Sequence, residues 1–258
     1  MGSGKSYNCL KLIAKQEVLY NEPFYETVLF CSTSGEFYKT VKVFKEAIEK
    51  SKFLTIKDTD LLSWLEEYIN KVTTYNILMN FVNKGLKNPD EDMQKIITDN
   101  NLHNPRKAIE FISKKLKEVG WKTYPHRLLL VCDDFASHPL LKRKEDPLSR
   151  MFKKLRHFNI NVIIIVQTVK SIPKDLKRNL SDCVIFPGIS KIDFFDLIKE
   201  SSLSCFDPDE LWSEYIKIND PQAMYSLHVA ARKIVITLPP KISDLEAMIA
   251  EDAAALKT

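Results

Sequence analysis

Four short, continuous apolar runs stand out along the chain, each bounded by polar or turn-forming residues. They cover residues 28–31, 128–132, 162–166 and 183–186. None alternates between apolar and polar positions, which is typical of strands buried on both faces of a parallel sheet. Because helical stretches separate the runs, the pattern predicts an α/β fold, with a mostly parallel sheet sandwiched by helices and joined by right-handed crossovers.

The long stretch between the first and second runs has a helical period instead. One amphipathic series follows Asp58, which we expect to be an N-cap, and a second follows Asn104-Pro105, a capping residue before a proline at the first helical position. We therefore interpret residues from about 36 to 125 as a mainly helical insertion in a single domain that covers residues 1–258.

The C-terminal part, from about residue 190 to residue 258, is expected to hold helices and a β-hairpin. Asp207-Pro208 begins one helix, and the acidic residues that follow suit the positive end of the helix dipole. Residues 224–229 and 234–238 are short β-prone runs joined by a brief polar connection, which predicts the hairpin.

Composition narrows the classes of protein. With 45% hydrophobic residues in 258, the chain can bury a sizeable core, and no apolar run approaches the roughly 18 residues of a membrane span. We expect an intracellular protein. The five cysteines are scattered, odd in number and mostly set in apolar runs, which favours reduced core thiols over disulfides or a metal site.

The net charge of +4 is mild, but the positive charge is concentrated in the middle of the chain. Two interpretations stay open: an ordinary solvated face, or a track for the phosphate backbone of a nucleic acid. The clusters are Lys114-Lys115-x-Lys117, Lys142-Arg143-Lys144, Arg150 with Lys153-Lys154-x-Arg156-His157, and Lys174 with Lys177-Arg178.

The N-terminal residues Met-Gly-Ser-Gly-Lys-Ser match the end of the phosphate-binding P-loop G-x-x-x-x-G-K-[ST], whose first glycine would lie two places before Met1. In that motif backbone N–H groups surround the phosphates, the lysine reaches the outer phosphates, and the serine ligates Mg²⁺. The chain then turns helical, with Leu10, Ile13 and Ala14 on one face. The alternative is a Gly/Ser-rich beginning or a cloning scar. The candidate nucleotide-binding residues are Gly2, Ser3, Gly4, Lys5, Ser6 and Tyr7.

The second apolar run ends in two carboxylates, Asp133 and Asp134. Asp133 is the candidate metal ligand beside Ser6, and Asp134 would orient or deprotonate the attacking water. Gln167, after the third run, could hydrogen-bond the γ-phosphate and the water, but its neutral amide cannot act as a base. Arg178 or Arg156 could reach a neighbouring subunit's nucleotide.

These motifs occur in the order Gly-Ser-Gly-Lys-Ser, Asp133-Asp134-Phe135, Arg156-His157, Val166-Gln167-Thr168, and Pro173 with Arg178-x-x-Leu180. In this order they resemble the genome-packaging ATPases of large double-stranded DNA viruses, a group within the FtsK–HerA superfamily that includes poxvirus and virophage members. The resemblance covers residues 1 to about 190. It implies a RecA-like P-loop NTPase fold of the ASCE class, in which the P-loop strand lies between the glutamine-bearing strand and the last core strand.

The resemblance also implies an activity and its partners. Such proteins are ring-forming, homo-oligomeric translocases that use ATP and Mg²⁺ to drive double-stranded DNA into a capsid, with an arginine finger supplied in trans. The implied protein partners are capsid or portal proteins. The implied location is the viral factory of the host cytoplasm, with the virion as a second location.

Two other functions stay open on the residues alone: a P-loop small-molecule kinase, and a nucleotide-binding assembly protein that does not hydrolyse ATP. Because the P-loop strand would lie in the interior of the sheet, we expect a chain that starts at Met1 to be poorly stable or inactive.

Overall fold

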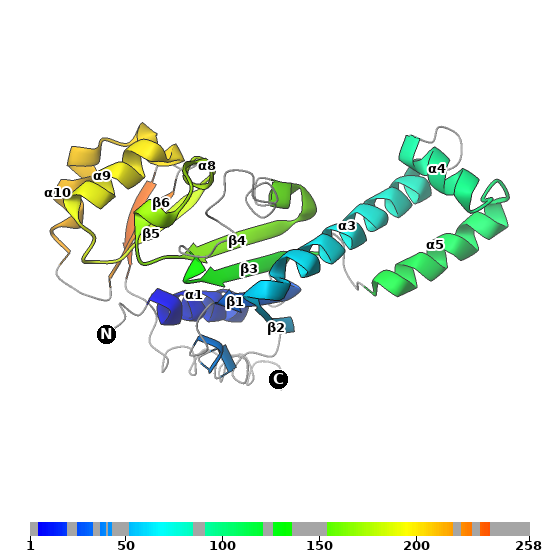
Figure 1. The fold of residues 1–258 in the computed structure, drawn as a ribbon, viewed down its shortest axis with the longest axis horizontal. Coiled ribbons are helices and arrows are strands. Elements are labelled where there is room, and N and C mark those ends of the chain that lie inside the picture. Colours follow the sequence, from blue (N-terminus) through cyan, green and yellow to red (C-terminus); the bar gives the residue numbers. More distant parts are fainter. Residues whose placement is uncertain are drawn as a thin grey trace, which may run out of the picture. The chain divides into compact units, whose positions relative to one another are not determined.

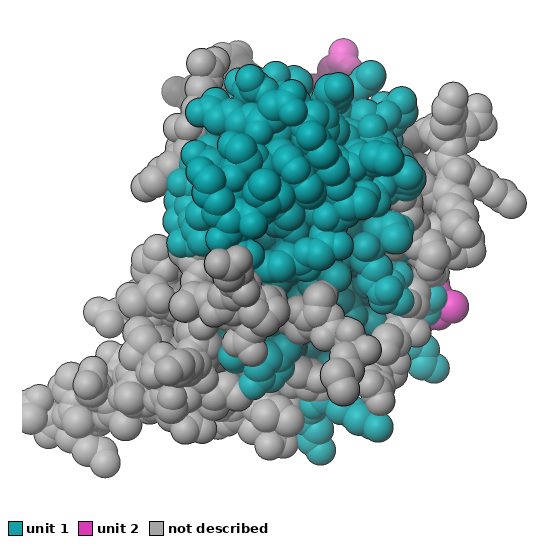
Figure 2. Space-filling model, turned by 90° about the vertical axis from the view of Figure 1, so that its left-hand side faces the viewer, with its two compact units in different colours: residues 1–58, 127–156, 160–258 teal, residues 59–126, 157–159 magenta. Residues whose placement is uncertain are grey.

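The computed structural model describes residues 5–19, 25–32, 37–39, 41–42, 52–84, 91–120, 126–135, 154–218, 223–228 and 233–237. The chain divides into two compact units (Figure 2). Unit 1 comprises Met1–Asp58, Arg127–Arg156 and Ile160–Thr258, and unit 2 comprises Thr59–His126 with His157–Asn159.

Unit 1 contains a parallel sheet with the strand order β2-β1-β3-β4 (Figure 1). The strands are β1 (Thr27–Ser32), β2 (Lys52–Lys57), β3 (Leu128–Asp133) and β4 (Ile160–Ile165). Every residue of β1 and β3 is buried, as their uninterrupted apolar sequences predict. The first three apolar runs are therefore confirmed as neighbouring parallel strands.

Helix α1 (Lys5–Leu19) packs against this sheet. Leu10 and Ile13 lie in one buried cluster with Phe30 of β1 and Val131 of β3. These two helix residues are three positions apart and so face the same side, as the predicted amphipathic pattern requires. The contact fixes the first turn of α1 at the carboxyl ends of the strands.

Strand β2 was not predicted, because its residues fall within the stretch interpreted as a mainly helical insertion. From Leu54 onward its residues alternate instead of forming a continuous apolar run: Leu54 and Ile56 are half-buried, whereas Thr55 and Lys57 are exposed. Such alternation is expected where a strand lies at the edge of a sheet and has one solvated face.

The fourth apolar run forms β5 (Asp182–Ile185), but the prediction that it continues the parallel sheet is wrong. β5 belongs to a second, antiparallel sheet with β6 (Met224–His228) and β7 (Lys233–Thr237), so its backbone is paired to the predicted hairpin. The hairpin itself is confirmed. Within the described residues, β4 pairs only with β3 and β5 only with β6. The apolar residues of β4 after Ile160 are correspondingly only half-buried.

The second sheet is covered by α9 (Lys191–Glu200), the 3-10 turn η5 (Ser202–Cys205) and α10 (Pro208–Tyr215). Aromatic rings fill the contact: the Phe194 ring lies 5.2 Å from that of Tyr215, which lies 5.8 Å from that of Tyr225. Helix α10 begins after Asp207, as predicted. The side chain of Asp207 accepts a 2.9 Å hydrogen bond from the backbone N–H of Asp209 and so caps the helix.

Unit 2 consists mainly of α3 (Leu61–Lys84), α4 (Glu91–Asp99) and α5 (Pro105–Val119) (Figure 1). Leu78, Ile97 and Ile112 bring the three helices into one buried cluster. Asn104 is the predicted N-cap of α5. Asp58 instead begins the 3-10 turn η1 (Asp58–Asp60), and α3 starts only at Leu61. The assignment of residues 36–125 as an insertion in a single domain stays a prediction.

No helix in the described part of the chain is both long and apolar enough to cross a bilayer. All five cysteines are free, and Cys31 and Cys132 are buried side by side on β1 and β3. Cys205 is exposed at the end of η5, so the expectation of core thiols does not hold for it.

Candidate active site

The first turn of α1 meets the carboxyl end of β3. Helix α1 begins at Lys5, and the hydroxyl of Ser6 donates a 2.5 Å hydrogen bond to Oδ1 of Asp133. The first N–H groups of a helix have no intrahelical partner, and together with the helix dipole they attract anions. Two motifs that lie 127 positions apart in the sequence therefore share one site. Residues 1–4, including the predicted Gly2, Ser3 and Gly4, lie outside the described residues.

Asp133 is buried, with 7% of the residue's surface exposed. Ser32, its register partner on β1, donates a 3.3 Å hydrogen bond to Oδ2. Burial raises the pKa of Asp133 above its ordinary value, while the hydrogen bonds from Ser6 and Ser32 and the charge of Lys5 oppose that rise.

These groups fit a magnesium ion bound together with a nucleotide. Mg²⁺ prefers oxygen ligands and is usually held by one or two protein groups, waters and the phosphates of a substrate. Ser6 and Asp133 offer a hydroxyl and a carboxylate oxygen at a helix N-terminus, where phosphates also bind. The residues present therefore suit the predicted MgATP.

Asp134 directly follows the last residue of β3, where the backbone leaves the strand conformation. Its φ of 56° lies in the left-handed region, which Asp and Asn tolerate better than most residues. Its backbone N–H donates a 3.1 Å hydrogen bond to the carbonyl of Ile165, the last residue of β4. The side-chain amide of Gln167 lies 3.4 Å from Oδ1 of Asp134, at the long limit of a hydrogen bond. The second carboxylate and the glutamine thus come together.

The structure treats the other predicted site residues differently. Tyr7 is half-buried against the core of α1 and the sheet, with Nζ of Lys11 4.7 Å from its ring centroid. Arg178 is exposed at the C-cap of α8 (Lys174–Lys177), and among the described residues nothing joins it to the carboxylates by a hydrogen bond or ion pair. Arg156 lies in the 3-10 turn η3 (Leu155–Phe158), and its side chain is outside the described set.

Two contributors were not predicted as site residues. Ser32 directly follows the first apolar run, and its place beside the end of β3 could have signalled its contact with Asp133. The Tyr38 hydroxyl accepts a 3.0 Å hydrogen bond from the Ser32 N–H and lies 2.7 Å from the carbonyl oxygen of Ile56. It therefore joins the ends of β1 and β2, and no local sequence signal reveals this.

The basic clusters divide into several environments. Lys115 is paired with Glu118 at 2.7 Å, and both Lys174 and Lys177 are paired with Glu200. Lys114, Lys117 and Lys154 are exposed. The clusters at residues 142–144 and 150–153 lie outside the described residues.

Comparison with known proteins gives a family and a fold. A family model described as "Poxvirus A32 protein" matches residues 14–209. The genome packaging NTPase B204 of Sulfolobus turreted icosahedral virus 2, in complex with ATP-gammaS, is 15% identical, with 92% of each chain covered and a TM-score of 0.51. B204 of Sulfolobus turreted icosahedral virus, described as a DNA-packaging ATPase, is also 15% identical, with 93% of each chain covered and a TM-score of 0.49. None of the curated protein sequences compared matched the chain. The first structural likeness shows that the fold is that of a P-loop packaging NTPase.

Proposed function

Because the chain belongs to the poxvirus A32 protein family, we propose that it is an ATPase that drives double-stranded DNA into a viral capsid. The proposal extends the family and fold with a mechanism built from the residues of the site. The name of the solved relative, a genome packaging NTPase, supports the same direction.

The proposed ATP site is the first turn of α1. Lys5 contacts the outer phosphates, and Ser6 and Asp133 hold Mg²⁺, which when bound neutralises charge on the phosphate oxygens. Gly2, Ser3, Gly4 and Tyr7 complete the proposed nucleotide-binding segment. The hydrogen bond between Ser6 and Asp133 is the single observation that carries the proposal, because it joins the two motifs as shared ligation of a metal requires.

Hydrolysis is proposed to depend on Asp134 and Gln167. Asp134 accepts a proton from the attacking water, and the amide of Gln167 orients that water against the γ-phosphate. Their proximity at 3.4 Å supports a common task. The metal ligand and the base are consecutive residues, yet the left-handed backbone of Asp134 gives the two side chains different surroundings.

Further parts of the proposal concern other molecules. Arg178 or Arg156 reaches the nucleotide of a neighbouring subunit in a homo-oligomeric ring, and exposed basic residues such as Lys114 and Lys117 follow the DNA phosphates. Capsid or portal proteins are the remaining partners. We expect the protein to work in the viral factory of the host cytoplasm and to enter the virion.

The test is Asp134→Asn, compared with the unsubstituted protein. Asparagine has nearly the same shape and also tolerates a left-handed backbone, so the fold and the affinity for ATP should be retained. Turnover should fall by about 10² to 10⁴, the usual contribution of a general base. Unchanged hydrolysis in this variant, measured by phosphate release beside ATP binding, would refute the assignment.

The same assay with and without double-stranded DNA separates the alternatives. Stimulation of hydrolysis by duplex DNA supports the translocase. Transfer of phosphate to a small acceptor without DNA would instead identify a kinase. Tight ATP binding without turnover in the wild-type protein would identify a non-hydrolysing assembly protein.

A further inference from the structure

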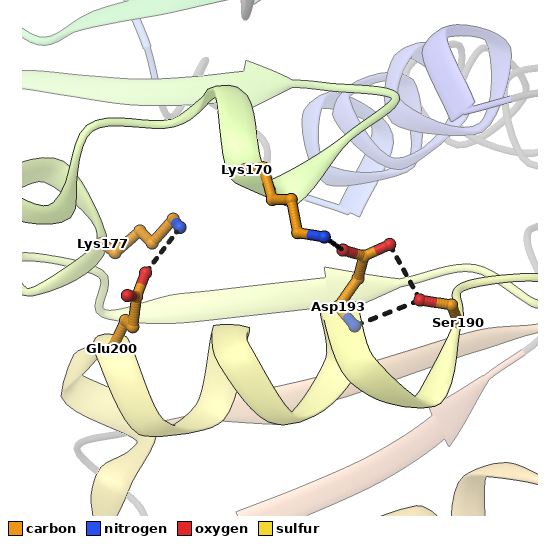
Figure 3. Close-up of polar contacts among 5 residues, drawn as sticks. All are labelled: Lys170, Lys177, Ser190, Asp193 and Glu200. Carbon is orange, nitrogen blue, oxygen red and sulfur yellow. Dashed lines mark hydrogen bonds and ion pairs between the residues drawn. The ribbon is translucent and has the colours of Figure 1, made fainter.

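Lys177 is the most enclosed of the charged groups near Arg178. Only 3% of its side chain is exposed, and its Nζ lies 3.0 Å from Oε2 of Glu200 at the end of α9 (Figure 3). A buried ammonium group costs free energy unless it is paired. A lysine that only contributed surface charge would not need to be buried. The contact therefore ties α8 to α9 at one defined point.

A second ion pair ties the segment just before α8 to the same helix. Nζ of Lys170, in the 3-10 turn η4 (Val169–Ser171), lies 3.2 Å from Oδ1 of Asp193 in the first turn of α9 (Figure 3). Asp193 is itself fixed by Ser190, whose hydroxyl donates to Oδ2 at 2.8 Å and accepts from the Asp193 N–H at 3.1 Å. Hydrogen bonds from Ser190 and Lys170 lower the pKa of Asp193, and hydrogen bonds from Lys174 and Lys177 lower the pKa of Glu200, so both groups are charged at neutral pH.

The tied segment begins and ends at proposed catalytic groups. Gln167 lies three residues before Lys170, and Arg178 directly follows Lys177. Gln167 and Arg178 are both exposed, whereas Val169 between them is buried in the core formed with α9. Both ends of α9 therefore hold one short segment that carries the glutamine and the arginine.

We propose that α9 positions this segment, and that the buried Lys177–Glu200 pair sets the direction in which the side chain of Arg178 projects from the surface of the subunit. This inference rests on the proposed function, and it selects Arg178 over Arg156 as the residue that acts in trans. An arginine finger must present its guanidinium at a defined place, because errors of about 1 Å in placement cost about 10²-fold in rate. Lys177 is a positioning residue and touches no substrate.

Lys174 provides a matched control. It pairs with the same Glu200, at 2.7 Å, but its side chain is 68% exposed. Exposed pairs contribute little, whereas breaking a buried pair disturbs the surrounding structure. Lys177→Met should therefore lower kcat about 10- to 100-fold while leaving the Kd for ATP within about twofold. Lys174→Met should leave kcat measured without DNA within about twofold, and Lys177→Arg should restore part of the lost rate.

A mixing experiment separates positioning from a general structural defect. Lys177→Met subunits have an intact nucleotide site but a displaced Arg178, whereas Lys5→Ala subunits lack ATP binding but have a well-placed Arg178. In mixed rings, the second kind can serve the first. Hydrolysis by the mixture should exceed the sum of the two variants measured alone.

Three results from the lysine variants would overturn the inference: wild-type kcat in Lys177→Met, equal losses in Lys177→Met and Lys174→Met, or no gain on mixing Lys177→Met with Lys5→Ala subunits. If circular dichroism shows that Lys177→Met does not fold, Glu200→Gln replaces it, because the amide keeps an oxygen acceptor for Lys177. The proposed function fails separately, through a wild-type protein without DNA-stimulated hydrolysis. If the wild type is active and an Arg178→Ala variant is equally active, the inference is refuted and the proposed function stands.

Discussion

The Tyr38 hydroxyl gives a sharp test of how the site is held at the end of the sheet. It accepts a hydrogen bond from the Ser32 N–H at 3.0 Å, and its single proton is shared between the carbonyl oxygens of Ser32, at 2.9 Å, and Ile56, at 2.7 Å. Burial raises the pKa of Tyr38 above its ordinary value of 10.0, so the hydroxyl remains a donor throughout the neutral range. Tyr38→Phe removes only this oxygen atom.

The expected loss follows from the bonds counted. One accepted and one donated hydrogen bond, at about 1 kcal/mol each, give a fall of about 2 kcal/mol in the free energy of unfolding. For a chain of this size that corresponds to a Tm lower by about 4–8 °C. Urea denaturation should show a lower midpoint with an unchanged m-value, because the surface exposed on unfolding stays the same.

Tyr225→Phe is the matched control. Its hydroxyl lies 3.4 Å from the Leu211 carbonyl oxygen and 3.3 Å from Oε2 of Glu214, which are longer and weaker contacts. We expect its loss to stay below about 1 kcal/mol. A Tyr38→Phe loss under about 0.5 kcal/mol, or one no larger than that of the control, would refute the reasoning.

Two further predictions concern Asp133 and Asn104. Because burial raises the pKa of Asp133 above 3.8, the folded state holds this proton more tightly than the unfolded chain; the resulting stability is complete below pH 3.8 and is lost as the pH rises through the folded pKa. Asp133→Asn should therefore gain stability relative to wild type as the pH rises from 3.8 through the raised folded pKa, and then level off. A pH-independent difference in urea titrations would contradict this. At the start of α5, Oδ1 of Asn104 accepts from the Arg106 N–H at 2.9 Å, so Asn104→Ala should cost about 1 kcal/mol and Asn104→Gly only a few tenths, as measured by thermal unfolding; equal losses would argue against capping.

Much of the fold could be predicted because local patterns carried it. The continuous apolar runs within β1 and β3 correctly predicted burial on both faces, and Asn104-Pro105 correctly predicted the start of α5. Strand β2 escaped because it has no continuous apolar run, and its alternation covers only the four residues from Leu54 to Lys57. The pairing of β5 escaped as well, because an apolar run does not say which strand it pairs with, and the expected burial on both faces also fails here, since Val184 is exposed.

The candidate site shows the same division. Chemistry with a known motif, as in Ser6, Asp133 and Gln167, could be read from spacing and strand ends, and the structure brings these residues into one place. Contacts between segments that are distant in the sequence could not be predicted in this way. The sequence shows Lys177 as one more basic residue, and only the folded chain reveals that it is enclosed against Glu200, 23 positions away.

The register of β1 and β3 places Asp133 beside Ser32, and this register therefore decides which of the two aspartates lies at the proposed metal site. Side chains alternate faces along a strand, so a shift of β3 by a single residue would carry Asp133 away from Ser32 and would bring its neighbour to the wrong side. One inserted or deleted residue within β3 should therefore abolish function even if both carboxylates survive. The same change in the connection before Leu128 leaves this parity intact, so length variation there should be tolerated.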